Sequence, residues 1–336
     1  MINKIYEYII RFIKEYYKEV LFIILVAFIS FYKLPYVIYK PGGSIDLTSR
    51  VNIEDGDEVS GSYSMNYVSV SRGNIANVLL SYLIKDWELV KEENANVPDM
   101  DYDTSFKIEQ LEYQNAIFLA VYNACNKIDC NLTIDSQESY VVYINDKADT
   151  NLEVMDKIIS IDDQTFKTFY DLREYIKSKK AGDKLKIIVK NDGKEIEKYA
   201  IIYEDNGESL IGISAYSTYE YTTTPEISIK TKNREAGPSG GLMLTLTIYD
   251  ILSEKDIANN RKIMGTGTID GGGNVGAIGG VKYKMLGAKK DKADVFFVPM
   301  ENCEEAKKVK KDYKIKYDVK CVATFDEALD YLLAKK

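Results

Sequence analysis

Residues 234–252 read REAGPSGGLMLTLTIYDIL, and this stretch decides the fold of the C-terminal third of the chain. Gly237 and Pro238 interrupt the backbone, and the apolar run that follows predicts a helix ending near Leu252. Ser239 therefore lies at the mouth of a helix, where unpaired backbone N–H groups can hold an oxyanion. A serine at such a place also serves as a helix N-cap or in an anion-binding nest, and this segment alone favours the cap.

The chain after residue 225 is predicted to alternate strands and helices. Its pattern predicts strands over 225–231, 264–269 and 295–299, and helices over 242–252, from 283 onward and over 324–336. Residues 276–284, GAIGGVKYK, supply two lysines after a tight glycine turn. A desolvated lysine has a lowered pKa and can act as the base for a serine, although most lysines are simply solvated.

Three motifs, in this order and at this spacing, resemble the proteolytic domain of Lon-type proteases: GPSGG at 237–241, TGT at 266–268 and GGVKYK at 279–284. The resemblance implies a Ser-Lys dyad in which Ser239 is the nucleophile. It assigns the base to Lys284, which lies four positions after the second glycine of the turn, Gly280. Lys282 lies nearby in the sequence and is the less favoured alternative base.

The same resemblance assigns supporting residues. Thr266 matches the family's threonine that hydrogen-bonds the catalytic lysine, and Gly237, Pro238 and Gly240 form the oxyanion and nucleophile loop. Two positions depart from the family pattern. Gly240 stands where alanine is usual, and Ala236 stands where many members carry an acidic residue, which suggests a different approach to the site.

The composition excludes whole classes of active site. The 336 residues include no histidine, which excludes Ser-His-Asp and Cys-His catalysis and histidine-held zinc. The net charge of -8 argues against a nucleic-acid surface. No G-x-x-x-x-G-K-[ST] motif occurs, and the G-x-G-x-x-G over 271–276 predicts a hairpin turn, so no nucleotide partner is expected. The sequence predicts neither a cofactor nor a metal site.

Residues 130–210 form a second unit with its own pattern. Strands are predicted over 139–144, 156–162 and 184–191, and a helix over 166–182. This order resembles a bacterial PDZ domain, in which the first strand and the helix flank a groove that takes a peptide by strand addition. The resemblance assigns five residues to that groove: Tyr140, Val141, Val142, Leu172 and Ile176. The usual carboxylate-binding loop is not evident before residue 139, and a spacer domain is the alternative.

The first forty residues predict a membrane anchor. Residues 20–32, VLFIILVAFISFY, are uncharged, and if Lys33 snorkels the apolar stretch continues through Ile38 to the roughly 20 residues that a bilayer crossing needs. We therefore expect a transmembrane helix over 20–39 in a bacterial cytoplasmic membrane, crossing it once. Basic residues before it favour a cytoplasmic N-terminus, with the catalytic domain outside. A signal peptide and a buried core helix are the alternatives.

The sequence as a whole predicts an α+β protein with four parts. They are a cytoplasmic N-terminus and transmembrane anchor (1–40), an extracytoplasmic α+β segment that packs with the Lon-like domain (41–129), the PDZ-like domain (130–210) and the Lon-type proteolytic domain (211–336). The second part is predicted to contain a strand over 63–70, a loop over 91–104 and a helix over 106–124. Disulfides between Cys125 and Cys130, or between Cys303 and Cys321, stay open.

These parts together resemble the membrane-anchored, PDZ-containing branch of Lon-like peptidases, which lacks the ATPase module. The resemblance implies an ATP-independent serine endopeptidase that cleaves exported peptides or unfolded and membrane-proximal protein segments. Its expected partners are such substrates and the lipid bilayer, and by resemblance it forms a homo-oligomer, a hexamer. Two alternatives stay open: an inactive membrane-tethered scaffold that binds peptides through the PDZ-like unit, and an amidohydrolase or self-processing protein that uses the same dyad.

Overall fold

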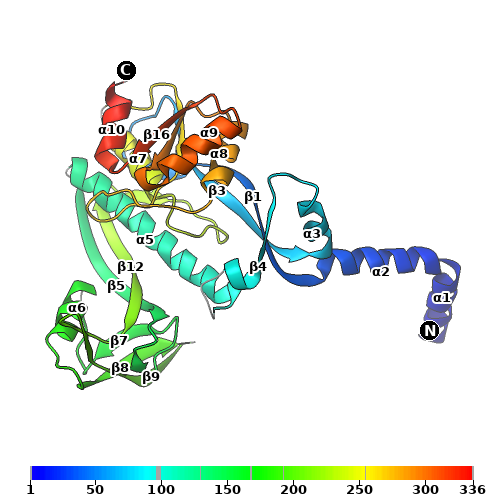
Figure 1. Ribbon diagram of the computed structural model, residues 1–336, viewed down its shortest axis with the longest axis horizontal. Coiled ribbons are helices and arrows are strands. Elements are labelled where there is room, and N and C mark those ends of the chain that lie inside the picture. Colours follow the sequence, from blue (N-terminus) through cyan, green and yellow to red (C-terminus); the bar gives the residue numbers. More distant parts are fainter. Residues whose placement is uncertain are drawn as a thin grey trace.

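The computed structural model describes residues 2–95, 100–128, 130–166, 169–191, 193–253 and 255–334. The described chain forms a larger unit built on one six-stranded sheet, a smaller unit built on a second, and an N-terminal helical arm. In Figure 1 the smaller unit lies at the end of a long strand pair, and the arm projects from the other end of the molecule. The mixture of sheets and helices is of the α+β kind that the sequence predicts.

The sheet of the larger unit joins distant parts of the chain. Its strand order is β16-β15-β14-β3-β1-β4, with bounds β1 Lys33–Asp46, β3 Ser62–Asn74, β4 Glu88–Lys91, β14 Lys262–Gly265, β15 Val295–Pro299 and β16 Asp318–Val322. β3, β14, β15 and β16 pair in parallel, whereas β1 runs antiparallel to β3 and β4. The first quarter of the sequence therefore completes the sheet that the C-terminal third begins.

Helices cover both faces of this sheet, as the period-2 alternation of its central strands requires. Ile263 and Phe297 belong to the hydrophobic core formed with α5 (Tyr102–Ile128), α7 (Gly241–Leu252) and α10 (Phe325–Ala334). Met264 and Phe296 point into a second core with α8 (Val281–Lys290) and α9 (Cys303–Asp312). A disulfide joins Cys303 of α9 to Cys321 of β16.

Helix α7 is the central helix of the first core. Apolar residues occupy every side of it, so it is buried along almost its whole length. Its two threonines are satisfied, because Thr245 and Thr247 donate their hydroxyl hydrogens to the carbonyl oxygens four residues earlier, at 2.9 and 2.7 Å. The helix predicted over 242–252 is confirmed, whereas the strand predicted over 264–269 ends at Gly265 and continues as a loop.

The smaller unit has the strand order β12-β5-β7-β8-β9-β6. Its elements are β5 Asn131–Ile144, β6 Asp149–Thr150, β7 Lys157–Ile161, α6 Phe169–Lys177, β8 Lys184–Asn191, β9 Lys194–Ile201 and β12 Ile213–Thr224, with a small β10–β11 hairpin, Tyr203–Asp205 and Glu208–Leu210. β12 pairs with β5 along the full length of both strands. The division predicted between residues 210 and 211 therefore falls just before a strand that belongs to this sheet.

The β5–β12 pair joins the smaller unit to helix α5 of the larger one. The ring of Phe118 on α5 stacks on Tyr219 of β12 with ring centroids 3.9 Å apart. A disulfide between Cys125 and Cys130 joins the end of α5 to the start of β5. The helix predicted over 106–124 is confirmed as part of α5, and the loop predicted over 91–104 contains the short helix α4, Glu92–Ala95, with residues 96–99 outside the described residues.

The N-terminal elements differ from the predicted transmembrane helix over 20–39. Helices α1 (Ile2–Glu15) and α2 (Tyr17–Phe31) form the arm, and the chain then enters β1 instead of continuing the helix. Pro35 cannot donate a helical hydrogen bond, and Val37 and Ile38 are buried where β1 pairs with β3 and β4. Among the described residues, no helix is both long enough and apolar enough to cross a membrane.

Three further elements are short. β2 (Val51–Ile53) pairs with β13 (Ile227–Ile229), which lies inside the strand predicted over 225–231. Helix α3 (Ile75–Ser81) follows β3 beside the end of α2, and a 3-10 turn, η1 (Met300–Asn302), precedes α9.

Candidate active site

The loop before α7 holds Ser239 in a fixed position. Gly237 adopts a left-handed φ of 86°, which suits glycine, and its N–H donates to the carbonyl of Glu109 on α5 at 2.7 Å. The carbonyl of Ser239 accepts two hydrogen bonds, from the N–H of Gly267 at 2.8 Å and from the hydroxyl of Thr266 at 3.0 Å. The backbone on both sides of the serine is thus attached to neighbouring elements.

Ser239 is not the cap of the helix that follows it. The N-cap residue of α7 is Gly240, and no side chain caps this end. Within the described part of the chain, the N–H groups of Ser239 and Gly240 donate to no acceptor, so they are available to an incoming oxyanion. The structure thus favours the oxyanion interpretation of this segment over the N-cap interpretation.

Lys284 reaches the same place from helix α8. Gly280 is the N-cap of that helix with a left-handed φ of 72°, and a Cβ there would lie 2.5 Å from Cγ2 of Val68, so the turn requires glycine. The side chain of Lys284 is buried, and its Nζ donates to Oγ1 of Thr266 at 3.1 Å. Burial lowers the pKa of the Lys284 amine to about 8. No ion pair opposes this effect among the described residues.

Lys282 lies in a different environment. Its Nζ is 3.6 Å from Oδ1 of Asp86, and its side chain is about one-third exposed, at 30%. It also lies over the rings of Tyr283 and Tyr313. A charged, paired lysine cannot accept a proton, so the geometry supports the assignment of the base to Lys284.

Thr266 connects the two predicted catalytic residues. Its hydroxyl donates to the carbonyl of Ser239 and accepts from Nζ of Lys284. The structure therefore brings Ser239, Thr266 and Lys284 together from three elements that are far apart in the sequence. Thr266 lies directly after β14. The strand ends at Gly265, and beyond it the hydroxyl of Thr266 and the N–H of Gly267 donate to the carbonyl of Ser239.

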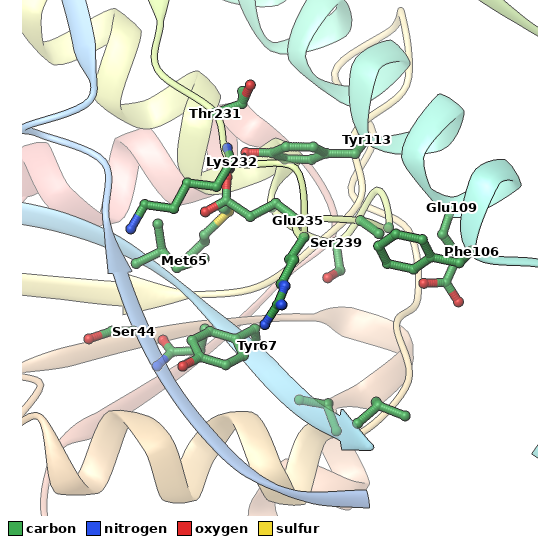
Figure 2. Close-up of a pocket in the computed structure, with 18 of the residues that line it drawn as sticks. Ser44, Met65, Tyr67, Phe106, Glu109, Tyr113, Thr231, Lys232, Glu235 and Ser239 are labelled. Atoms are coloured by element: carbon green, nitrogen blue, oxygen red, sulfur yellow. Dashed lines mark hydrogen bonds between the residues drawn. The ribbon is translucent and has the colours of Figure 1, made fainter. Parts of the chain in front are cut away.

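Ser239 lies on the wall of a cleft of about 1110 Å³. Figure 2 shows side chains entering it from three directions: Phe106, Glu109 and Tyr113 from α5, Ser44, Met65 and Tyr67 from β1 and β3, and Thr231, Lys232 and Glu235 from the loop before Ser239. The floor is largely apolar and aromatic, whereas three cations lie on the loop side: Lys230, Lys232 and Arg234. Such a cleft is large enough for several residues of an extended peptide.

Glu235 is a functional candidate that the sequence did not reveal. Its Oε1 accepts from Nη1 of Arg50 at 2.5 Å, and its Oε2 accepts from the N–H of Lys232 at 3.0 Å and the hydroxyl of Tyr113 at 3.4 Å. The carboxylate therefore attaches the loop before Ser239 to α5 and to the start of β2. No local motif signals this role, because Arg50 lies 185 residues away in the sequence.

We expect Glu235→Gln to lower kcat/KM by on the order of tenfold, because the loop that carries Ser239 loses its ion pair with Arg50. The change should fall on kcat as well as KM, and the pH at which activity is half-maximal should stay unchanged because Lys284 is untouched. Steady-state kinetics of peptide cleavage measures both. Glu226→Gln, at an exposed glutamate before β13, is the matched control, and equal kinetics for the two variants would show that Glu235 does not position the loop.

The two departures from the family pattern differ in their structural setting. A Cβ on residue 240 would lie 2.4 Å from Sδ of Met65, so Met65 fills the space that the methyl group of an alanine would need. Ala236 lines the cleft, and the neighbouring Glu235 provides the acidic side chain in this segment.

The five residues assigned to a peptide groove on the PDZ-like unit lie in β5 and α6. Val141, Leu172 and Ile176 are buried in the core of this unit, and Val142 is buried as well. The hydroxyl of Tyr140 donates to Glu138. From residue 139 to residue 141, β5 pairs with β12 on one edge and with residues 155–158 on the other, so these three residues offer no open edge, and peptide binding by this unit stays a prediction.

Comparison with known proteins gives two family matches. Residues 225–335 match the Lon protease (S16) C-terminal proteolytic domain, and residues 128–198 match the PDZ domain family. The first match contains Ser239, Thr266 and Lys284, and the second contains β5, α6 and β8. The helical arm and residues 33–127 lie outside both matches.

The curated relatives match about a third of the chain. The chain is 29% identical to Lon protease 2 of Borreliella burgdorferi over 126 residues, which is 36% of this chain and 16% of that protein. It is 32% identical to the Lon protease of Rickettsia bellii over 100 residues, 30% of this chain and 13% of that protein. The chain thus spans a sixth or less of the length of these two relatives.

Among solved structures, the PDZ domain of an SdrC-like protein from Listeria monocytogenes is 32% identical, covers 25% of this chain and 90% of its own, and has a TM-score of 0.22. The family matches and the assembled residues agree on the organisation of the chain. It carries a PDZ domain followed by a Lon-type (S16) proteolytic domain.

Proposed function

We propose that this protein is a serine endopeptidase that uses Ser239 and Lys284 as a dyad and needs no ATP. One observation carries the proposal: Thr266 hydrogen-bonds both the backbone of Ser239 and the buried, readily deprotonated amine of Lys284. Burial supplies the neutral base that this histidine-free chain needs. The Lon-type domain match supports the same chemistry.

The reaction follows from this geometry in two halves. Neutral Lys284 takes the hydroxyl proton of Ser239, and the serine oxygen attacks the substrate carbonyl to form a tetrahedral oxyanion. The N–H groups of Ser239 and Gly240 donate to that oxyanion. Lys284 gives its proton to the leaving amine, and an acyl-enzyme forms. Water then attacks the ester, passing a proton to Lys284, and the serine recovers it as the carboxylic product leaves.

The cleft supports extended, flexible substrates. Its floor offers aromatic and aliphatic side chains, and no segment of the chain has the phosphate-binding motif of an unfolding ATPase. We therefore propose unfolded or membrane-proximal protein segments and exported peptides as substrates. By resemblance to the Lon-type family, we propose that the protein acts as a homo-oligomer, a hexamer.

We also propose that the arm attaches the protein to the bacterial cytoplasmic membrane. Helix α2 has large apolar side chains exposed on all sides: Leu21, Phe22, Ile23, Ile24, Leu25, Val26, Phe28 and Phe31. An apolar surface of this extent on a projecting helix needs a nonaqueous partner. The two disulfides favour an oxidising compartment for the catalytic unit, outside the cytoplasm. The cytoplasmic N-terminus stays a prediction.

The proposal is tested by incubating the full-length protein in detergent or vesicles with an unfolded protein and identifying the products by mass spectrometry. We expect internal cleavage by the unmodified protein and none by Ser239→Ala. Cleavage that survives in Ser239→Ala would rule out the serine as nucleophile. A folded, assembled protein that cleaves nothing would instead support the inactive scaffold, in which binding by the PDZ domain is the function.

The cations beside Ser239 predict a preference for acidic substrates. Lys230, Lys232 and Arg234 have no ion-pair partner among the described residues, whereas the charge of Arg50 is balanced by Glu235. Burial, and next the charge of Glu112, raise the pKa of the Glu109 carboxyl on the opposite wall. The three cations of the loop therefore outnumber the carboxylates of Asp46 and Glu109 that also line the cleft.

We expect the double substitution Lys232→Glu and Arg234→Glu to slow cleavage of a peptide with acidic residues by on the order of tenfold and to speed cleavage of its basic counterpart. Both effects should shrink at high salt. The matched control is Lys308→Glu with Lys311→Glu on the exposed side of α9, which makes the same change in net charge. A similar response of both double variants would exclude a local role for the cations.

A further inference from the structure

Residues 75–84 form an unusual apolar surface that the proposed activity does not use. They comprise helix α3 and the turn after it, and residues 73–84, GNIANVLLSYLI, contain no charged side chain. Five large side chains are exposed: Leu79 60%, Leu80 41%, Tyr82 76%, Leu83 82% and Ile84 38%. In water such a concentration of exposed aliphatic groups is unfavourable, so the segment needs a covering partner.

This surface is fixed beside the apolar helix α2. The side-chain amide of Asn74 donates from Nδ2 to the carbonyl of Ser30 near the end of α2, at 2.7 Å. Its Oδ1 accepts from the N–H of Asn77, also at 2.7 Å, and so caps the start of α3. Figure 1 shows α3 next to the junction of α2 with β1. The two apolar surfaces therefore adjoin at the same end of the molecule.

The residues around this surface have the composition of a membrane boundary. Lys33 and Lys85 are exposed directly after the two apolar segments. Tyr32 and Tyr82 are exposed with them, and Trp87, the single tryptophan of the chain, follows. Tyrosine, tryptophan and lysine are the residues that favour the headgroup region of a bilayer.

We propose that residues 75–84 are a second membrane-docking element, which lies in the acyl-chain boundary of a phospholipid bilayer beside α2. This inference rests on the proposed attachment of the arm to a membrane. Two points of attachment would fix the rotation of the larger unit relative to the bilayer, which a single projecting helix does not.

The docking also determines where the cleft lies. Val70 lines the cleft and lies four residues before Asn74, a distance of about 13 Å along β3. On the neighbouring strand, Val37 lines the cleft four residues after Lys33. The active cleft would thus open close to the headgroups, so that segments emerging from the membrane reach it first.

The test uses the full-length protein in phosphatidylcholine–phosphatidylglycerol vesicles. Because all four cysteines form disulfides, Leu83→Cys supplies a single free thiol for an environment-sensitive fluorophore. We expect a blue-shifted emission that lipids spin-labelled on the acyl chain quench, and neither effect for the matched variant Lys308→Cys on the exposed side of α9. Protein that floats with the vesicles but gives the same emission at both positions would overturn the proposal. Protein that fails to float would instead overturn the attachment on which it rests.

The rate of peptide cleavage on vesicles provides a second test. Leu79→Glu with Leu83→Glu should slow cleavage of a lipid-anchored peptide on vesicles by on the order of tenfold and leave cleavage of the same soluble peptide unchanged. Ile134→Glu, at an exposed isoleucine of β5, is the matched control and should alter neither rate. Equal rates on the lipid-anchored peptide for all proteins would overturn the proposal. Loss of the oligomer in the double variant would also overturn it, because the surface would then be covered by another copy of the chain.

Discussion

Lys284→Met is expected to abolish peptide cleavage and to leave a folded protein. The neutral amine of Lys284 is the base that accepts the proton of Ser239, and methionine keeps the length and apolar body of the side chain without a proton acceptor. Loss of a general base of this kind costs about 10²–10⁴-fold in rate. The rate of cleavage of a fluorogenic peptide at saturating enzyme measures the loss.

Lys282→Met is the matched control, two residues away on the same helix. It removes a lysine that is paired with Asp86 at 3.6 Å and about one-third exposed, so activity should change less than about threefold. If instead Lys282→Met were inactive and Lys284→Met active, the base would have been assigned to the wrong lysine.

The stability of Lys284→Met separates a catalytic loss from a folding defect. The pKa of Lys284 is about 8 in the folded protein, against 10.5 for an ordinary lysine. Below pH 8 the amine is therefore protonated in both the folded and the unfolded protein. In that range the folded protein bears the full free-energy cost of burying the charge. Removing it should raise the free energy of unfolding at pH 7 by about 3 kcal/mol. The gain should fade as pH rises from 8 towards 10.5, where the lysine is neutral in the folded state. A less stable variant would contradict the burial argument.

The sequence predicted the catalytic elements because they are local. GPSGG and GGVKYK each place a functional residue beside a helix start, and short-range turn geometry decides both positions. Choosing between Lys282 and Lys284 required the family resemblance, because both lysines lie on the first two turns of α8. Only the packed structure shows that one is buried against Thr266 and the other paired with Asp86.

Pairing between distant segments is what the sequence does not show, and it is the reason that the transmembrane prediction is wrong. The apolar run predicts a transmembrane helix over 20–39, but Val37 and Ile38 are apolar because they are buried where β1 lies between β3 and β4. The sequence also does not show that β12 pairs with β5 along its full length, because about seventy residues separate the two strands in the chain. The sequence does not predict the ion pair of Arg50 with Glu235 either, because the two residues lie far apart in the chain.

The pH dependence of cleavage should follow the titration of Lys284. The reactive form has a neutral amine, and its fraction falls tenfold for each pH unit below the pKa of about 8. We expect kcat/KM to rise with a slope of about one up to pH 8 and to level off above it. Because the chain has no histidine, no second step is expected near pH 6.5 from the enzyme itself.

Thr266→Val tests the cause of this profile. The threonine hydroxyl accepts a hydrogen bond from Nζ of Lys284, and this bond stabilises the charged amine. Removal of this hydroxyl should lower the pKa of Lys284 further, so the midpoint of the pH–rate profile should move to lower pH. The maximal rate should also fall, because the carbonyl of Ser239 loses a hydrogen bond. Initial rates on one peptide from pH 5.5 to pH 10, with circular dichroism at each pH to confirm folding, give both quantities. A midpoint that stays at the same pH in Thr266→Val, or one near 10.5 in the unmodified protein, would show that a different group controls the reaction.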